Sequence, residues 1–310
     1  MKILDVQSIS RSFGNVKAVD NVSFSVSAGE ICGFIGPNGA GKTTTMRICS
    51  TLELPDSGDV LVSGSSVLDD PRGVTRKIGF MPDAYASEQN TPVRDYLDFH
   101  ARAQGLRGAE RDKAMRSVID FTGLDPLLDK EILALSKGMR QRAGLAVTLL
   151  HDPSLLILDE PAAGLDPRAR VELRELLTVL AEMGKAVLIS SHILTELSEI
   201  CDVVAVIEAG TIRASGRVSD IQKKLSPDAL YYMRCLAEGE ALQRFLLEQP
   251  GVDKVRAEGH GCVFGLAGGE EALADLLGRA VNQDLRPMEV RPLAVDLEEV
   301  FLSLTDGVVQ

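Results

Sequence analysis

The sequence predicts an α/β protein built on a buried parallel sheet, followed by a smaller α+β unit. Short, uninterrupted apolar runs are typical of strands that are buried on both faces of a parallel sheet. Between residues 155 and 207 these runs alternate with helical patterns, as βα repeats do. After a break near residues 216–227 the predicted order becomes β-α-β-β-α-β. We therefore expect one domain over residues 1–220 and an accessory domain over residues 221–310.

The composition excludes several classes of protein. The 310 residues carry a formal net charge of −12, so we expect no nucleic-acid partner held by a general basic surface. No apolar run approaches the roughly 18 residues of a membrane-spanning helix, and the first residues lack the apolar core of a signal peptide. The five cysteines are widely and irregularly spaced, which indicates neither a disulfide framework nor a metal site. These features predict a cytoplasmic chain.

Apolar patterning predicts the strands of the first domain. Alternating positions indicate half-buried strands, and continuous apolar runs indicate strands buried on both faces. The alternating strands span residues 3–10 and 18–26, with short ones within 55–80, and the continuous runs span 30–35, 155–158, 186–190 and 203–207. We expect an antiparallel β subdomain from the first group and a parallel sheet from the second.

Helical patterns fall between the continuous strands and in an inserted segment. Those between strands span residues 42–51, 167–183 and 193–200. The insert begins at Thr91, which we expect to cap a helix with Pro92 at its first position and Gly105 at its end. Two further helices, near 111–121 and after Ser136, complete a predicted helical subdomain.

The second domain follows the ferredoxin-like order. Its predicted strands span residues 230–236, 252–257, 262–266 and 288–292, and its predicted helices span 240–248 and 270–282. Beyond them, Leu297, Val300, Phe301 and Leu304 recur at helical spacing. We interpret this last stretch as packing against the small sheet rather than as a partner-binding helix.

A phosphate-binding loop joins the strand over 30–35 to the following helix. Residues 36–43 fit G-x-x-x-x-G-K-[ST] at every fixed position. The glycines let backbone N–H groups turn toward a phosphate, and the helix N-terminus adds positive potential. Lys42 offers a charge to the β- and γ-phosphates, and the Thr43 hydroxyl offers an oxygen to Mg²⁺. The expected nucleotide-binding residues here are Gly36, Pro37, Asn38, Gly39, Ala40, Gly41, Lys42, Thr43 and Thr44.

Two acids follow the buried strand over 155–158. Asp159 is placed at the strand end, where a carboxylate can hold Mg²⁺ in phosphoryl-transfer sites. Glu160 lies beside it and can orient or deprotonate an attacking water. Together with the phosphate loop, these acids predict a P-loop nucleoside triphosphatase.

A third motif discriminates among such enzymes. It consists of Leu135, Ser136, Lys137, Gly138 and Met139. Ser136 can cap the following helix, so that amides and a hydroxyl point outward at an anion. At this point the sequence resembles the ATP-binding-cassette (ABC) ATPases, whose signature is Leu-Ser-Gly-Gly-Gln, over about residues 2–220. The resemblance implies ATP and Mg²⁺ as cofactors, and two chains that sandwich two ATP molecules between phosphate loops and signatures.

The resemblance also implies roles for residues outside these motifs. Phe13 takes the place of the aromatic that stacks on adenine, with Val19 nearby. His192 matches the switch histidine, so the expected catalytic residues are Glu160, His192 and Lys42. The loop that crosses the dimer interface corresponds to Ala163, Gly164, Leu165 and Asp166.

The sequence departs from the family pattern at two places. The signature has Lys137 and Met139 where the family has glycine and glutamine, but Ser136 and Gly138 are retained. Asp83 stands where the family usually has glutamine. Its carboxylate is a good Mg²⁺ ligand, so the expected metal ligands are Thr43, Asp83 and Asp159. The alternative is that Asp83 only caps the turn after Pro82.

The resemblance implies the ATP-hydrolysing subunit of an ABC transporter. The signature variants and the residues over 297–305 favour an exporter. Its expected partners are integral membrane permease subunits and a second ATPase subunit, identical or different, which would hold it on the inner face of the cell membrane. The alternatives are an importer ATPase, a soluble ABC ATPase that acts on ribosomes or DNA, and a tail that senses a small molecule.

Overall fold

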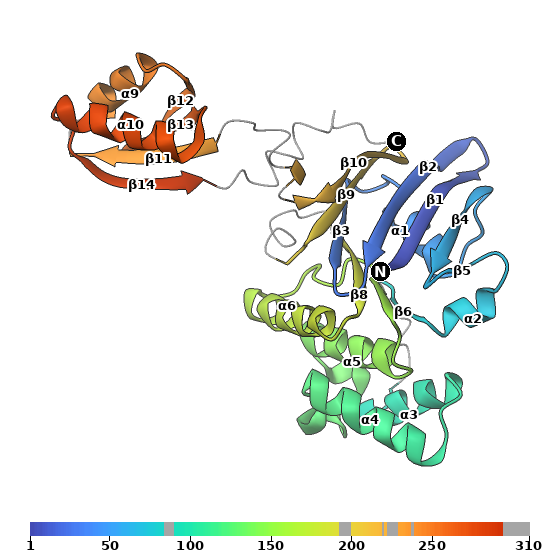
Figure 1. Cartoon of the computed structure of the whole chain (residues 1–310). Helices are drawn as coiled ribbons and strands as arrows, with labels where there is room; N and C mark the ends of the chain where they lie inside the picture. The colour runs from blue at the N-terminus through green and yellow to red at the C-terminus, as the bar shows by residue number, and fades with distance from the viewer. Residues whose placement is uncertain (84–89, 192–199, 219, 222–228, 237–238, 294–310) are drawn as a thin grey trace. The chain divides into compact units, whose positions relative to one another are not determined.

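The chain forms two compact units, whose described residues lie within Met1–Val218 and Ser219–Ser303. The computed structural model (Figure 1) describes residues 1–83, 90–191, 200–218, 220–221, 229–236 and 239–293. Each unit has its own apolar core. Among the described residues, no helix combines the length and apolar character needed to cross a membrane.

A mostly parallel sheet organises the first unit. In the described part of the chain its strand order is β10-β9-β3-β8-β7-β6, with β10 antiparallel to β9 and the other neighbours parallel. The strands are β3 (Ile31–Ile35), β6 (Ile78–Met81), β7 (Leu155–Leu158), β8 (Ala186–Ser191), β9 (Val203–Glu208) and β10 (Thr211–Arg217). Every residue of β3, β7 and β8 is buried, which confirms the prediction from the continuous apolar runs. The prediction missed β10 because its exposed and half-buried residues are largely polar.

An antiparallel sheet packs against the helix that follows the phosphate loop. Its strands are β1 (Lys2–Phe13), β2 (Val16–Ser27), β4 (Ser57–Val62) and β5 (Ser65–Ser66), in the order β2-β1-β4-β5. Side chains from this sheet, from α1 (Lys42–Cys49) and from one face of the parallel sheet share one core. Met46 and Ile48 of α1 are completely buried there. This core anchors α1, whose first residues belong to the phosphate loop.

Three helices form the predicted insert, shown in green in Figure 1. They are α3 (Val93–Ala103), α4 (Gly108–Thr122) and α5 (Lys137–Leu149), and each packs against the other two. The other helices in the described part of this unit are α2 (Pro71–Thr75), α6 (Pro167–Glu182) and the 3₁₀ turns η1 (Asp125–Leu127) and η2 (Ile132–Ala134). Only strands were predicted over residues 55–80, so α2 was missed.

The predicted start of α3 is wrong by one residue. Pro92, rather than Thr91, is the N-cap, and the helix begins at Val93. Pro92 has an extended ψ of 147° because it pairs with Glu131, while the Thr91 carbonyl accepts the N–H of Ile132 at 2.9 Å. Gly105, with φ of +88°, follows the last turn as predicted.

The second unit has the predicted ferredoxin-like fold. Its elements are β11 (Ala229–Cys235), α9 (Gly239–Leu247), β12 (Val252–Glu258), β13 (Gly261–Leu266), α10 (Gly269–Asn282) and β14 (Pro287–Leu293). The sheet order is β12-β13-β11-β14, and neighbouring strands are antiparallel. Phe245 and Leu246 of α9 and Leu276 of α10 are buried in its core. The predicted helices over 193–200 and 297–304 lie outside the described residues.

Candidate active site

A cavity of about 280 Å³ lies over the N-terminus of α1. It is lined by Ala18, Pro37, Asn38, Gly39, Gly41, Lys42, Thr43, Thr44, Asp83 and Glu160. The structure therefore brings together most of the predicted phosphate loop with two of the predicted acids. Asp159 is 2% exposed and contacts this group through Thr43.

Two glycines allow the loop to pass close to neighbouring backbone. A Cβ atom at Gly36 would overlap the carbonyl oxygen of Ile207, and one at Gly41 would overlap the carbonyl oxygen of Ala18. Gly41 also has a φ of +103°, a conformation that side-chain-bearing residues rarely adopt. It is the N-cap of α1 and gives the helix no side-chain cap, and the cavity lies over this helix start. This is the helix-terminus geometry that favours an anion.

The Lys42 ammonium is buried among three acceptors. Its Nζ atom lies 2.7 Å from the carbonyl oxygen of Gly36, 3.2 Å from that of Pro37 and 3.5 Å from a carboxylate oxygen of Glu160. Burial lowers the pKa of Lys42 from its usual value, and the Glu160 carboxylate opposes that shift. A desolvated cation of this kind interacts strongly with phosphate charge.

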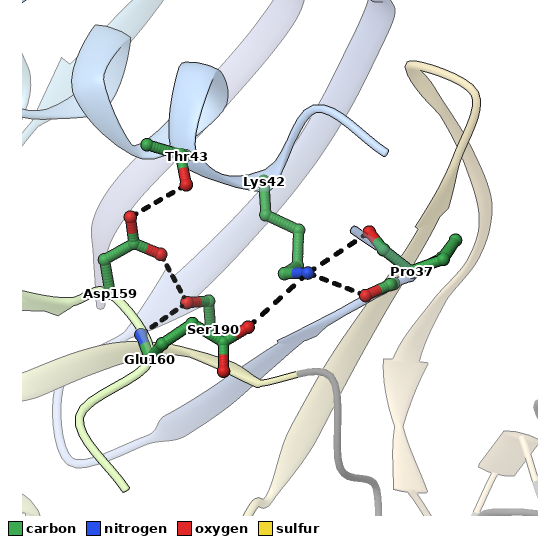
Figure 2. A network of polar contacts seen from close by, with 7 residues as sticks. Pro37, Lys42, Thr43, Asp159, Glu160 and Ser190 are labelled. Carbon is green, nitrogen blue, oxygen red and sulfur yellow. Dashed lines mark hydrogen bonds and ion pairs between the residues drawn. The ribbon is translucent and has the colours of Figure 1, made fainter. Parts of the chain in front are cut away.

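Figure 2 shows how the two acids are held. The Thr43 hydroxyl donates to Asp159 Oδ2 at 2.9 Å, and the Ser190 hydroxyl donates to Asp159 Oδ1 at 2.6 Å. The backbone N–H of Glu160 donates to the same Ser190 oxygen at 2.8 Å. Glu160 itself has a φ of +48°, which is uncommon for a residue with a side chain.

Sequence reasoning missed Ser190. The available signal was weak: two serines end the apolar run of β8, beside the strand that ends in Asp159. The parallel register pairs Leu158 with Ile189, so the residues that follow these two are neighbours at the sheet edge. A prediction of this contact requires the order and register of the strands.

Oxygen atoms dominate the potential metal-binding part of the site. Thr43 and Asp159 present a hydroxyl and a carboxylate next to each other, and Asp83 lines the same cavity. These are hard donors of the kind that Mg²⁺ prefers. Among the described residues, no group of three or more His, Cys, Asp or Glu side chains is placed to bind a metal by itself.

Phe13 and Val19 lie outside this cavity lining, as do Gly36, Ala40 and Asp159. Phe13 is at the end of β1, 47% exposed, with the Arg11 guanidinium 5.0 Å from its ring centre. Val19 is completely buried in the core, and its neighbour Ala18 lines the cavity instead. His192 lies outside the described residues.

Comparisons with known proteins match this chain to one family. The family model described as ABC transporter matches residues 19–163. The Nod factor export ATP-binding protein I of Rhizobium sp. (strain N33) is 33% identical over 97% of this chain and 96% of its own length. The linearmycin resistance ATP-binding protein LnrL of Bacillus subtilis (strain 168) is 29% identical over 98% of each chain. A solved ATP-binding subunit of an ABC transporter, 30% identical, superposes with a TM-score of 0.64 over 72% of this chain and 93% of its own.

The chain belongs to the ABC transporter ATP-binding proteins. Its P-loop NTPase fold is therefore that of the ABC ATPases, as the resemblance in the sequence implied. The members of this family bind ATP, which agrees with a phosphate loop at the centre of the cavity.

The predicted signature forms the start of α5. Ser136 is its N-cap and accepts the N–H of Met139 at 3.3 Å, while Leu135 is buried. Gln141, in the second turn, donates to the carbonyl oxygen of Pro161 at 2.9 Å. The signature helix is thus tied directly to the turn that follows Glu160.

The predicted interface loop lies against the signature. Asp166 caps α6 by accepting the N–H of Ala169 at 2.9 Å. A Cβ atom at Gly164 would lie 2.7 Å from Lys137 Nζ, so the lysine side chain covers this glycine. Between the two predicted segments, the structure shows this contact of Lys137 with Gly164. The predicted residues of the two segments are Leu135, Ser136, Lys137, Gly138, Met139, Ala163, Gly164, Leu165 and Asp166. None of them lines the 280 Å³ cavity.

Proposed function

We propose that this chain is the ATP-hydrolysing subunit of an ABC exporter. The network of Thr43, Asp159 and Glu160 beside the buried Lys42 carries the proposal, because it sets a water-activating acid next to phosphate and metal donors. Export is supported by the names of the relatives, one of a Nod factor export protein and one of a linearmycin resistance protein, which match almost the full chain.

The phosphate loop would bind the nucleotide. The first-turn amides of α1 and the buried Lys42 ammonium would bind the β- and γ-phosphates, and burial strengthens the attraction of the ammonium for negative charge. Phe13, which is 47% exposed at the end of β1, would stack on the adenine. Ala18 and Thr44 would complete the walls of this site.

Mg²⁺ fits the donors at the edge of the cavity. Thr43 and Asp159 would hold it, directly or through its water shell, with Asp83 as a third oxygen donor. When bound, the ion neutralises charge on the phosphate oxygens. Asp159 is buried and already oriented by two hydroxyl groups, so little reorganisation is needed to bind the ion.

Glu160 would orient the attacking water and accept its proton. Its carboxylate borders the cavity and lies 3.5 Å from Lys42, while its backbone is held by Ser190. His192, which follows β8 in the sequence, would be a second catalytic residue beside Glu160 in this mechanism. Positioning and charge neutralisation supply most of the rate enhancement in phosphoryl transfer, so the geometry of these groups is decisive.

The exposed signature explains why two subunits would be needed. Ser136 caps an outward-facing helix start that does not border the cavity of its own chain. A second copy or a related subunit would bring its own nucleotide to this helix start, across the loop from Ala163 to Asp166.

We propose residues 1–220 as the nucleotide-binding domain and residues 221–310 as an accessory domain. The dimer would act from the cytoplasmic face of the membrane on separate permease subunits.

Substitution Glu160→Gln tests the catalytic assignment. The amide retains the size of the side chain but cannot accept a proton, so we expect ATP binding to persist and turnover to fall at least about 100-fold. Lys42→Ala should instead lose nucleotide affinity, because it removes the buried charge. Equilibrium binding of a fluorescent ATP analogue and single-turnover hydrolysis separate the two effects. A wild-type single-turnover rate in Glu160→Gln would remove Glu160 from the mechanism.

A further inference from the structure

Ser190 connects the two acids of the active site. It lies near the end of β8 and is completely buried. Its hydroxyl uses its one proton to bond Asp159 Oδ1 at 2.6 Å and accepts the N–H of Glu160 at 2.8 Å (Figure 2). One atom therefore contacts the side chain of the first acid and the backbone of the second.

The bond to Asp159 helps to fix the orientation of its carboxylate group. Ser190 takes Oδ1, and the Thr43 hydroxyl takes Oδ2 at 2.9 Å. With both oxygens engaged on opposite sides, the carboxylate cannot rotate without breaking a buried hydrogen bond, which is costly in a site closed to water. The plane of the carboxylate is thus set by Ser190 as much as by Thr43.

The bond to Glu160 stabilises an uncommon backbone conformation. Glu160 has a φ of +48°, and left-handed conformations are unfavourable at residues other than glycine. Such a conformation persists only where surrounding contacts over-determine it. Ser190 supplies one of those contacts, and the backbone direction at Glu160 decides where its carboxylate emerges.

We propose that Ser190 is a positioning residue that orients Asp159 toward the metal and Glu160 toward the attacking water. This inference rests on the proposed ATP hydrolysis. Only a hydroxyl group can donate to a carboxylate and accept from an amide at the same position. Alanine would leave both partners unsatisfied, and cysteine would fill the volume with a weak donor and a weak acceptor.

The test compares three substitutions at this position with a matched control. Ser190→Ala removes the hydroxyl, Ser190→Cys preserves volume, and Ser190→Thr restores a hydroxyl on a strand that favours β-branched residues. The control is Ser50→Ala, which removes another buried serine hydroxyl, one that donates only to carbonyl oxygens at the end of α1. Circular dichroism and binding of a fluorescent ADP analogue in EDTA report that each variant is folded with an intact phosphate loop.

The main readout is the gain in affinity for the ADP analogue on adding Mg²⁺, which does not depend on turnover. We expect Ser190→Ala and Ser190→Cys to bind the analogue normally in EDTA, but to need about 10–100-fold more Mg²⁺ for the gain. Single-turnover hydrolysis should fall by a similar factor. Ser190→Thr and Ser50→Ala should stay within about threefold of the wild-type protein in both measurements.

Two outcomes would overturn the inference. One is a wild-type Mg²⁺ titration in Ser190→Ala. The other is a Ser190→Cys variant that behaves as the wild-type protein does, because volume rather than hydrogen bonding would then be the property that matters. If Ser190→Ala does not fold, the comparison of the cysteine and threonine variants decides. Failure of the proposed function is distinct: the wild-type protein would show no hydrolysis while the Mg²⁺ titrations still rank the variants.

Discussion

Asp83 is a residue at which the candidate site differs in chemistry from the family pattern. It lines the same cavity as Thr43 and Glu160, so a short, charged side chain stands where the ABC ATPases usually have glutamine. A carboxylate in this place adds negative charge beside Asp159 and Glu160. That charge is stabilised when a divalent cation is shared among the oxygens, which favours the ligand role over the capping role.

Substitution of Asp83 distinguishes these roles. Asp83→Ala should shift the Mg²⁺ titration of ATPase activity to higher concentrations and slow hydrolysis, because one oxygen ligand is lost. Asp83→Gln should restore much of both, since its amide supplies an oxygen with longer reach. If Asp83 only caps the turn after Pro82, alanine would cost about 1 kcal/mol of stability and all three Mg²⁺ curves would superimpose.

At the scale of elements, the signature helix is held at both ends. Near its start, Gln141 bonds the turn after Glu160. Beyond its end, the Nε2 atom of His151 donates to the carbonyl oxygen of Ile78 in β6 at 2.9 Å. His151 Nδ1 is buried and has no hydrogen-bond partner among the described residues. Protonation would therefore bury an unpaired N–H group.

This contact predicts a pH dependence of stability. Burial lowers the pKa of His151, with Lys185 acting in the same direction and Ile78 and Asp152 opposing. The unfolded chain, with a histidine pKa near about 6.5, then binds more protons than the folded chain. The stabilisation is fully present above that pH and is lost as the pH falls through it toward the folded-state value.

Urea unfolding at pH 7.5, 6.5 and 5.5 measures the slope of the free energy of unfolding against pH. His151→Gln should reduce the loss of unfolding free energy on acidification, because the amide can donate to the Ile78 carbonyl but does not titrate. His260→Gln is the matched control, since His260 is exposed in the second unit. Burial also lowers the pKa of His100, so part of the slope should remain in the His151 variant. An unchanged slope in His151→Gln would contradict the assignment.

At the scale of the whole molecule, the two units have separate apolar cores and separate sheets. Every described residue of the 280 Å³ cavity belongs to the first unit. We expect a chain that ends at Val218 to bind ATP with an affinity close to that of the full chain. Circular dichroism and binding of a fluorescent ATP analogue check this. A shortened chain that folds normally but binds no nucleotide would contradict the independence of the second unit.

Most of the helices and strands and the phosphate-loop pattern could be predicted from local sequence patterns. A short continuous apolar run such as β7 is typical of a strand buried on both faces, and the glycines around Lys42 serve a local backbone turn. The ferredoxin-like order of the second unit was readable for the same reason. Local patterning failed where a strand is largely polar, as in β10, and where a distant contact moved a helix start, as Glu131 does at Pro92.

The orientation of the two acids depends on contacts between strands that are distant in the sequence. Ser190 reaches Asp159 and Glu160 because β7 and β8 pair in parallel register and end at the same edge, across 30 or more residues of chain. The contact of Lys137 with Gly164 likewise depends on the packing of α5 beside the loop before α6. Such contacts leave no periodic signal in the sequence. They arise from strand order and helix packing, which are properties of the whole fold.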